Sequence, residues 1–135
     1  MITGLKREAI DRLEVRKSLV DLWIDRGVLV FRGLDVDEEF HIALSEVFGK
    51  PDMHPIFKDR PDQHPVLIDI RSKKGSSVFR VDGELRGGWL PWHSDLIYVD
   101  RINRGGILRA LSVPQHGGET GFVDRIAAYE RMPQE

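Results

Sequence analysis

The pattern of apolar and polar residues predicts a helix followed by a buried strand at the start of the chain. Over residues 5–26 apolar side chains recur at helical spacings, and Gly27 supplies a C-terminal stop. Residues 28–33, with the sequence VLVFRG, form a short, mainly apolar run with two β-branched valines, which favours a buried strand. The apolar side of the first helix is expected to hold Leu13, Val20 and Trp23.

The strongest helical pattern lies in residues 34–51, LDVDEEFHIALSEVFGKP. Asp37 can cap the N-terminus of this helix, and the two glutamates after it suit the positive end of the helix dipole. Gly49 and Pro51 are expected to end the helix. Its apolar positions repeat at i, i+3, i+4, i+7 and i+8, namely Phe40, Ala43, Leu44, Val47 and Phe48.

Beyond residue 51 the pattern changes to short apolar runs separated by polar and glycine-rich stretches. A hairpin is expected around Asp82-Gly83, and a short helix opened by Asp124 is expected over residues 124–132. Strands are predicted at residues 65–70, 93–99, 106–113 and 120–123. Helices followed by a run of strands indicate an α+β fold with a sheet as its main scaffold.

Composition and charge narrow the class of protein. The chain has 135 residues, 41% of them hydrophobic and 31% charged, with a net charge of −2, which is typical of one soluble globular domain. No basic footprint for nucleic acid and no membrane-spanning apolar run is present in the sequence, so we expect a cytoplasmic protein without nucleic-acid or membrane partners. The absence of cysteine restricts any metal site to nitrogen and oxygen ligands.

One short motif raises the question of a metal site. His93 and Asp95 are separated by one residue in LPWHSDLIYVD, residues 90–100. In an extended segment, residues i and i+2 project to the same face, so the two side chains could occupy adjacent positions on one metal. An imidazole and a carboxylate are two of the three ligands of the facial triad that holds non-heme Fe(II). Taken alone, such a pair is more often a surface or hydrogen-bonded histidine with an unrelated aspartate than a pair of metal ligands.

The wider sequence resembles the taurine dioxygenase (TauD/TfdA) family of Fe(II)- and 2-oxoglutarate-dependent dioxygenases. That family has a W-H-x-D motif, then a V-P-x-x-G-G-[DE]-T turn, then an A-A-Y-E-x-[LM]-P helix. This chain has WHSD at residues 92–95, VPQHGGET at 113–120 and AAYERMP at 127–133, in the same order and at family spacing. The resemblance covers residues 28–135, and it implies a double-stranded β-helix, or jelly roll, with helices packed on it.

The resemblance implies a role for four residues. His93 and Asp95 match the first two iron ligands, and Thr120 matches a threonine that hydrogen-bonds 2-oxoglutarate. His54 matches a position that contacts the anionic group of the substrate, although a water-facing loop histidine explains it equally well. Trp92 is expected to pack over the site from one side. The sequence departs from the taurine enzyme at two positions near the substrate, Phe57 and Trp89.

The resemblance implies hydroxylation of a small organic substrate, for which an anion is one candidate. The reaction would consume O₂ and 2-oxoglutarate and release succinate and CO₂. The family's third iron ligand and the arginine that binds 2-oxoglutarate lie further along than residue 135, so we expect residues 1–135 to be the N-terminal half of one such domain. Alone it would be inactive. Two alternatives remain open: a non-catalytic binding or structural module, and a short cupin-like metal site completed by His54 or His116. The identity of the substrate stays open. The oligomeric state also stays open, and a homo-oligomer is one alternative.

Overall fold

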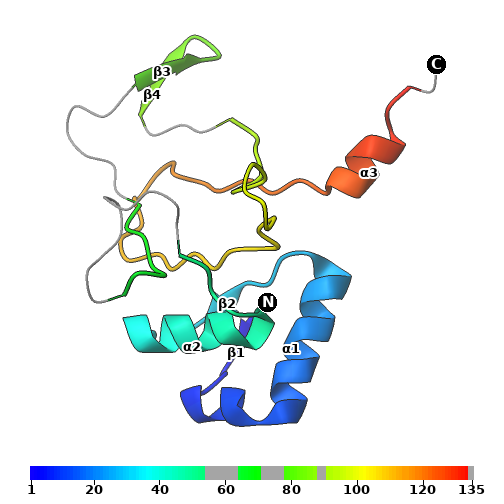
Figure 1. Ribbon diagram of the computed structural model, residues 1–135. Coiled ribbons are helices and arrows are strands. Elements are labelled where there is room, and N and C mark those ends of the chain that lie inside the picture. Colours follow the sequence, from blue (N-terminus) through cyan, green and yellow to red (C-terminus); the bar gives the residue numbers. More distant parts are fainter. Residues whose placement is uncertain (54–63, 71–77, 88–90, 134–135) are drawn as a thin grey trace. The chain divides into compact units, whose positions relative to one another are not determined.

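The computed structural model describes residues 1–53, 64–70, 78–87 and 91–133 (Figure 1). The chain divides into two compact units. The first combines Met1–Phe48 with Leu108–Glu135, and the second is Gly49–Ile107. Helices and short strands are both present, so the fold is α+β as predicted. The expected large sheet is absent from the described residues, which form only two sheets of two strands each.

The first predicted helix is divided in two. A 3₁₀ helix, η1, spans Arg7–Asp11, and the α-helix α1 spans Leu13–Arg26. The break occurs at Arg12, whose backbone is extended (φ −80°, ψ 127°). The break turns Ile10 inward while Leu13 stays 79% exposed, so placing Leu13 on the apolar side was wrong. Gly27 ends α1 in the left-handed region (φ 69°), as the sequence predicts.

The second helix, α2, spans Glu38–Phe48 and begins as the sequence predicts (Figure 1). Asp37 caps it, because the backbone N–H of Phe40 donates to the Asp37 carboxylate at 2.6 Å. Trp23 of α1 meets Phe48 edge to face, with ring centroids 5.5 Å apart. The buried apolar side chains of the described residues all come from η1, α1 and α2: Ile10, Leu19, Phe40, Leu44 and Val47.

The buried strand predicted at residues 28–33 is shorter and more exposed than expected. Only Phe31–Arg32 form a strand, β2, which pairs in parallel with β1 at Ile2–Thr3. Phe31 is half-buried and Arg32 is exposed. Because β2 pairs only with β1, the described residues form no larger sheet here that could bury both faces of this apolar run.

The predicted hairpin is confirmed in the second unit. Strands β3 (Val78–Val81) and β4 (Glu84–Gly87) pair antiparallel, with Val81 opposite Glu84. Asp82 and Gly83 connect them, and both have positive φ (52° and 84°), as a type I′ turn requires. The strands predicted at residues 65–70 and 93–99 are wrong: the chain turns at residues 65–66 and again at 95–98.

In the first unit, residues 108–133 run as an extended segment followed by a short helix. The helix, α3, spans Arg125–Glu130, and its cap is the predicted Asp124, which accepts from the N–H groups of Ile126 and Ala127. Residues 106–113 and 120–123 are not strands, contrary to the prediction. Among the described residues, no helix has the length and apolar character needed to cross a membrane.

Candidate metal and co-substrate site

The side chains of His93 and Asp95 point toward each other. The imidazole Nε2 lies 3.0 Å from a carboxylate oxygen of Asp95. Both side chains are open to solvent, with 49% of His93 and 72% of Asp95 exposed. Two ligand atoms at right angles on one metal, each bonded at about 2.1 Å, are about 3 Å apart, so this pair fits adjacent positions on one ion.

The other ring nitrogen of His93 fixes the orientation of the imidazole. Nδ1 lies 2.7 Å from the carbonyl oxygen of Pro91 and must donate to it, because a carbonyl only accepts. This hydrogen bond, and after it the interaction with Asp95, raises the pKa of His93. A metal at Nε2 would replace the proton shared with Asp95, while the Pro91 contact would keep the ring in place. Pro91 was not among the predicted site residues, and its only signal in the sequence is its separation of two residues from His93.

The backbone that presents the pair differs from the extended strand that was predicted. Residues 95–98 form a turn, and Leu96 has a positive φ of 52°. That conformation is costly for a leucine and reverses the chain directly after Asp95. The two side chains therefore meet within a loop segment that leads directly into a turn. The alternation of side chains along a sheet strand is not the reason.

An ion pair within the same unit follows the motif. The Arg101 guanidinium donates to the Asp52 carboxylate across 49 residues of chain. This hydrogen bond lowers the pKa of Asp52. Nothing in the sequence marks either residue, because the pairing depends on a fold that brings distant loop segments together.

The other predicted site residues stand as follows. Thr120 belongs to the first unit, and its side chain is exposed. Trp92 is 72% exposed, so the expectation that it packs over the site was wrong. His54, together with Phe57 and Trp89, lies outside the described residues.

Among the residues that the structure describes, the metal donors around the motif are His93 and Asp95 themselves. In the described ranges, no three histidine, aspartate or glutamate side chains lie together in a way that could hold a metal ion. His93 and Asp95 are chemically suited to Fe(II), which accepts imidazole nitrogen and carboxylate oxygen. His116, one of the residues considered for a cupin-like site, is exposed in the first unit.

Comparison with known proteins shows one protein family and several relatives to which this chain is similar. The sequence model of the family described as "Taurine catabolism dioxygenase TauD, TfdA family" matches residues 5–135. An alpha-ketoglutarate-dependent 2,4-dichlorophenoxyacetate dioxygenase of Cupriavidus pinatubonensis is 34% identical over 136 residues, covering 96% of this chain and 47% of that protein. An alkylsulfatase of Acinetobacter baylyi is 30% identical, covering 84% of this chain and 32% of that protein.

A third relative is similar over the whole chain. The (S)-phenoxypropionate/alpha-ketoglutarate-dioxygenase of Sphingobium herbicidovorans is 27% identical, covering 100% of this chain and 45% of that protein. The chain thus spans less than half the length of each of these relatives. No solved structure gives a significant match. Since the family match extends over nearly every residue, from 5 to 135, the chain belongs to the TauD/TfdA family.

Proposed function

We propose that the protein containing this chain is an Fe(II)- and 2-oxoglutarate-dependent dioxygenase, in which His93 and Asp95 are two of the three iron ligands. The observation that carries the proposal is the 3.0 Å approach of His93 Nε2 to Asp95 within the WHSD motif. Family membership over residues 5–135 and the relatives whose names specify alpha-ketoglutarate support it.

The residues of this chain would prepare the site by holding protons and orienting groups. The Pro91 carbonyl keeps the proton of His93 on Nδ1, so that Nε2 is available as a ligand. The Asp95 carboxylate adds one negative charge to the cation site. Thr120, with a hydroxyl that can donate, would hold a carboxylate of 2-oxoglutarate. Iron bound there would supply the redox chemistry by which decarboxylation of 2-oxoglutarate to succinate and CO₂ accompanies hydroxylation by O₂.

The substrate is proposed to be a small organic anion. The names of two relatives specify a phenoxyacetate and a phenoxypropionate, both of which carry a carboxylate, and a third is named an alkylsulfatase. His54 is the residue of this chain proposed to meet the anionic group. A cytoplasmic location agrees with such small-molecule chemistry.

Succinate release by the longer protein tests the proposal. We would supply Fe(II), 2-oxoglutarate and air with 2,4-dichlorophenoxyacetate, 2-phenoxypropionate or hexyl sulfate. His93→Ala and Asp95→Ala should each abolish substrate-linked succinate release and weaken Fe(II) binding. His116→Ala and Asp100→Ala are matched controls that replace exposed residues elsewhere. Unchanged iron affinity in both motif variants would refute the assignment, and loss of iron binding in His116→Ala would favour the cupin-like alternative.

We further propose that this chain is one half of the catalytic domain and that the jelly roll is completed by polypeptide outside it. The chain spans 47% and 45% of two relatives. Within the described ranges, buried apolar side chains come only from residues 10–47, while eight large apolar side chains of residues 108–133 are exposed: Leu108, Leu111, Val113, Phe122, Val123, Ile126, Tyr129 and Met132. Exposed apolar side chains in this number are expected to be covered, and we propose that the remaining polypeptide of the domain covers them.

The isolated 135-residue chain tests this second proposal. Mixed with Fe(II) and 2-oxoglutarate without oxygen, it should give no strong visible charge-transfer band, and with oxygen and substrate it should release no succinate. The longer protein is the positive control in both assays. A band and substrate-linked turnover from residues 1–135 alone would show that the chain is a complete site.

A further inference from the structure

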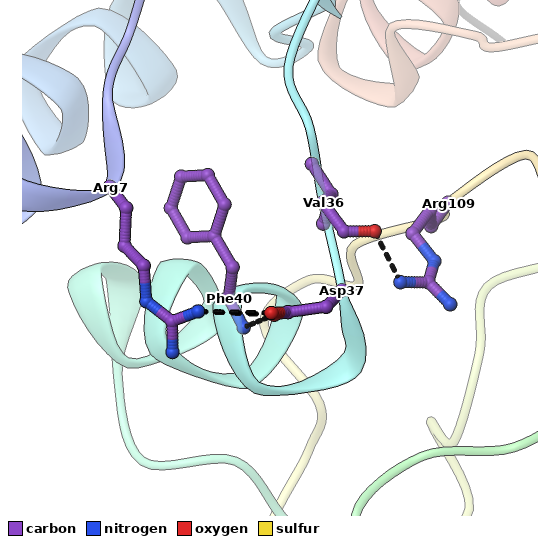
Figure 2. A network of polar contacts seen from close by, with 5 residues as sticks. All are labelled: Arg7, Val36, Asp37, Phe40 and Arg109. Carbon is purple, nitrogen blue, oxygen red and sulfur yellow. Dashed lines mark hydrogen bonds and ion pairs between the residues drawn. The ribbon is translucent and has the colours of Figure 1, made fainter.

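A charged contact joins residues far apart in the first unit. Arg109 lies in the extended segment that leads toward Thr120, and its Nη1 donates to the carbonyl oxygen of Val36 at 2.6 Å (Figure 2). The two residues are 73 positions apart, and both are half-buried. A hydrogen bond from a guanidinium is stronger than one between neutral groups, and partial burial limits competition from water.

The acceptor end of this contact is fixed to the core. Val36 is followed by Asp37, whose carboxylate accepts from the N–H of Phe40 at 2.6 Å and pairs with Arg7 at 3.1 Å (Figure 2). Phe40 is 3% exposed at the centre of the packed helices. The Arg109 charge also contributes to lowering the pKa of Asp37, after the Phe40 hydrogen bond and the Arg7 pair. Arg109 therefore binds the residue directly before the Asp37 cap of α2, next to the packed helices.

The chain that follows Arg109 leads into a compact turn at residues 114–118. Gly117 and Gly118 have positive φ values of 74° and 75°. A Cβ atom on Gly118 would lie 2.9 Å from Cγ of Pro114, so the proline ring packs directly against this glycine. Thr120 follows two residues later. The Arg109 contact and the Pro114–Gly118 contact therefore both constrain the path of the chain that leads to Thr120.

We propose that Arg109 is a positioning residue: by binding the Val36 carbonyl, it fixes the segment that carries Thr120 against the N-terminus of α2. The consequence for 2-oxoglutarate rests on the proposed function, because Thr120 is the residue proposed to bind that co-substrate. Loss of the contact leaves the segment and its turn intact but free to shift. The energy of 2-oxoglutarate binding must then also order this segment, which weakens the affinity.

The test compares Arg109→Met with Arg109→Lys in the longer protein. Methionine keeps an unbranched side chain, shorter than that of arginine, without a donor, and lysine restores a charged donor. Two quantities are measured: amide hydrogen exchange of residues 115–120, and the dissociation constant of 2-oxoglutarate for the Fe(II)-loaded protein without oxygen. Arg131→Met, which replaces an exposed arginine of the same unit, is the matched control.

For Arg109→Met we expect exchange at residues 115–120 to accelerate and the dissociation constant of 2-oxoglutarate to rise roughly threefold to tenfold, which lies within the range of coupling through packed contacts. Fe(II) affinity should stay the same, and Arg109→Lys should recover most of both effects. A lower melting temperature with unchanged exchange and unchanged 2-oxoglutarate affinity would overturn the proposal, because Arg109 would then only stabilise the fold.

Thr120→Val separates this inference from the proposed function. If Thr120→Val leaves 2-oxoglutarate affinity unchanged, the assignment of Thr120 fails, and hydrogen exchange in Arg109→Met still decides whether Arg109 fixes the segment. If Thr120→Val weakens 2-oxoglutarate binding while Arg109→Met changes neither quantity, the function stands and the positioning role is refuted.

Discussion

Two regions of the same unit differ sharply in how their apolar side chains are placed. Residues 1–48 contain every buried apolar side chain of the described chain, on η1, α1 and α2. Residues 108–133 contain none, although Phe122, Ile126 and Tyr129 are as apolar as many core residues. The first region stabilises itself by packing helix on helix. The second is attached to it by directed polar contacts such as Arg109 to Val36, so it depends on few interactions.

The difference suggests a division of roles. The packed region supplies a fixed reference, and the exposed region presents Thr120 in a glycine-rich turn. A segment with little buried area opens at low free energy and can adapt to a ligand or to a further part of the domain. Four predictions test this contrast.

The largest effect is expected from Phe40→Ala. Phe40 is 3% exposed, so its truncation leaves a void in the core and should destabilise the 135-residue chain by about 3–5 kcal/mol. Phe122, which is 64% exposed, is the matched control, and Phe122→Ala should change stability by less than about 0.5 kcal/mol. Urea unfolding followed by circular dichroism measures both. Equal losses would contradict the contrast between the two regions.

The same Phe122→Ala substitution should behave differently in the longer protein. If further polypeptide covers residues 108–133, Phe122 becomes buried, and its truncation should then cost on the order of 3 kcal/mol. Urea unfolding of the longer protein, with and without the substitution, gives the number. A loss as small as in the isolated chain would mean that this apolar surface is not an intramolecular interface.

Gly118→Ala should have a local effect of intermediate size. Alanine would need a positive φ near 75° and would bring its Cβ to 2.9 Å from the Pro114 ring, so the turn should lose about 1–3 kcal/mol. Gly106→Ala is the control, since nothing lies within 4 Å of a Cβ there. Amide exchange of Glu119 and Thr120 in the longer protein reports the opening of the turn. Equal exchange in both variants would argue against the tight turn.

The smallest effect is expected from acid titration of Asp37. The Phe40 N–H, and after it the Arg7 charge, hold the pKa of Asp37 below its ordinary 3.8 in the folded chain. The carboxylate therefore stabilises the fold above pH 3.8, and this stability is lost as the pH falls through the folded-state value. Asp37→Asn should keep the cap but show a shallower loss of melting temperature between pH 5 and about pH 2. Asp35→Asn should retain the steep loss found in the unsubstituted chain.

Local signals in the sequence predicted the elements that depend on neighbouring residues. The caps at Asp37 and Asp124 use contacts within three residues, and the Asp82-Gly83 hairpin pairs residues that are no more than nine apart. The strands at 65–70 and 93–99 were predicted wrongly, because a strand requires a hydrogen-bonded partner that periodicity cannot supply. The break at Arg12 was also missed, since helical spacing continues across it while the burial of Ile10 requires a change of direction.

For the candidate site, the sequence by itself determined which residues are chemically suited: His93 and Asp95 as nitrogen and oxygen donors, and Thr120 in a glycine-rich turn. Motif order and family spacing determined the family. Only the tertiary structure decided that the pair lies 3.0 Å apart in a loop outside any strand, that Pro91 orients the imidazole, and that Arg109 meets Val36. Residue types and short spacings are written in the sequence, whereas contacts across a turn or across 73 residues exist only once the backbone path is fixed.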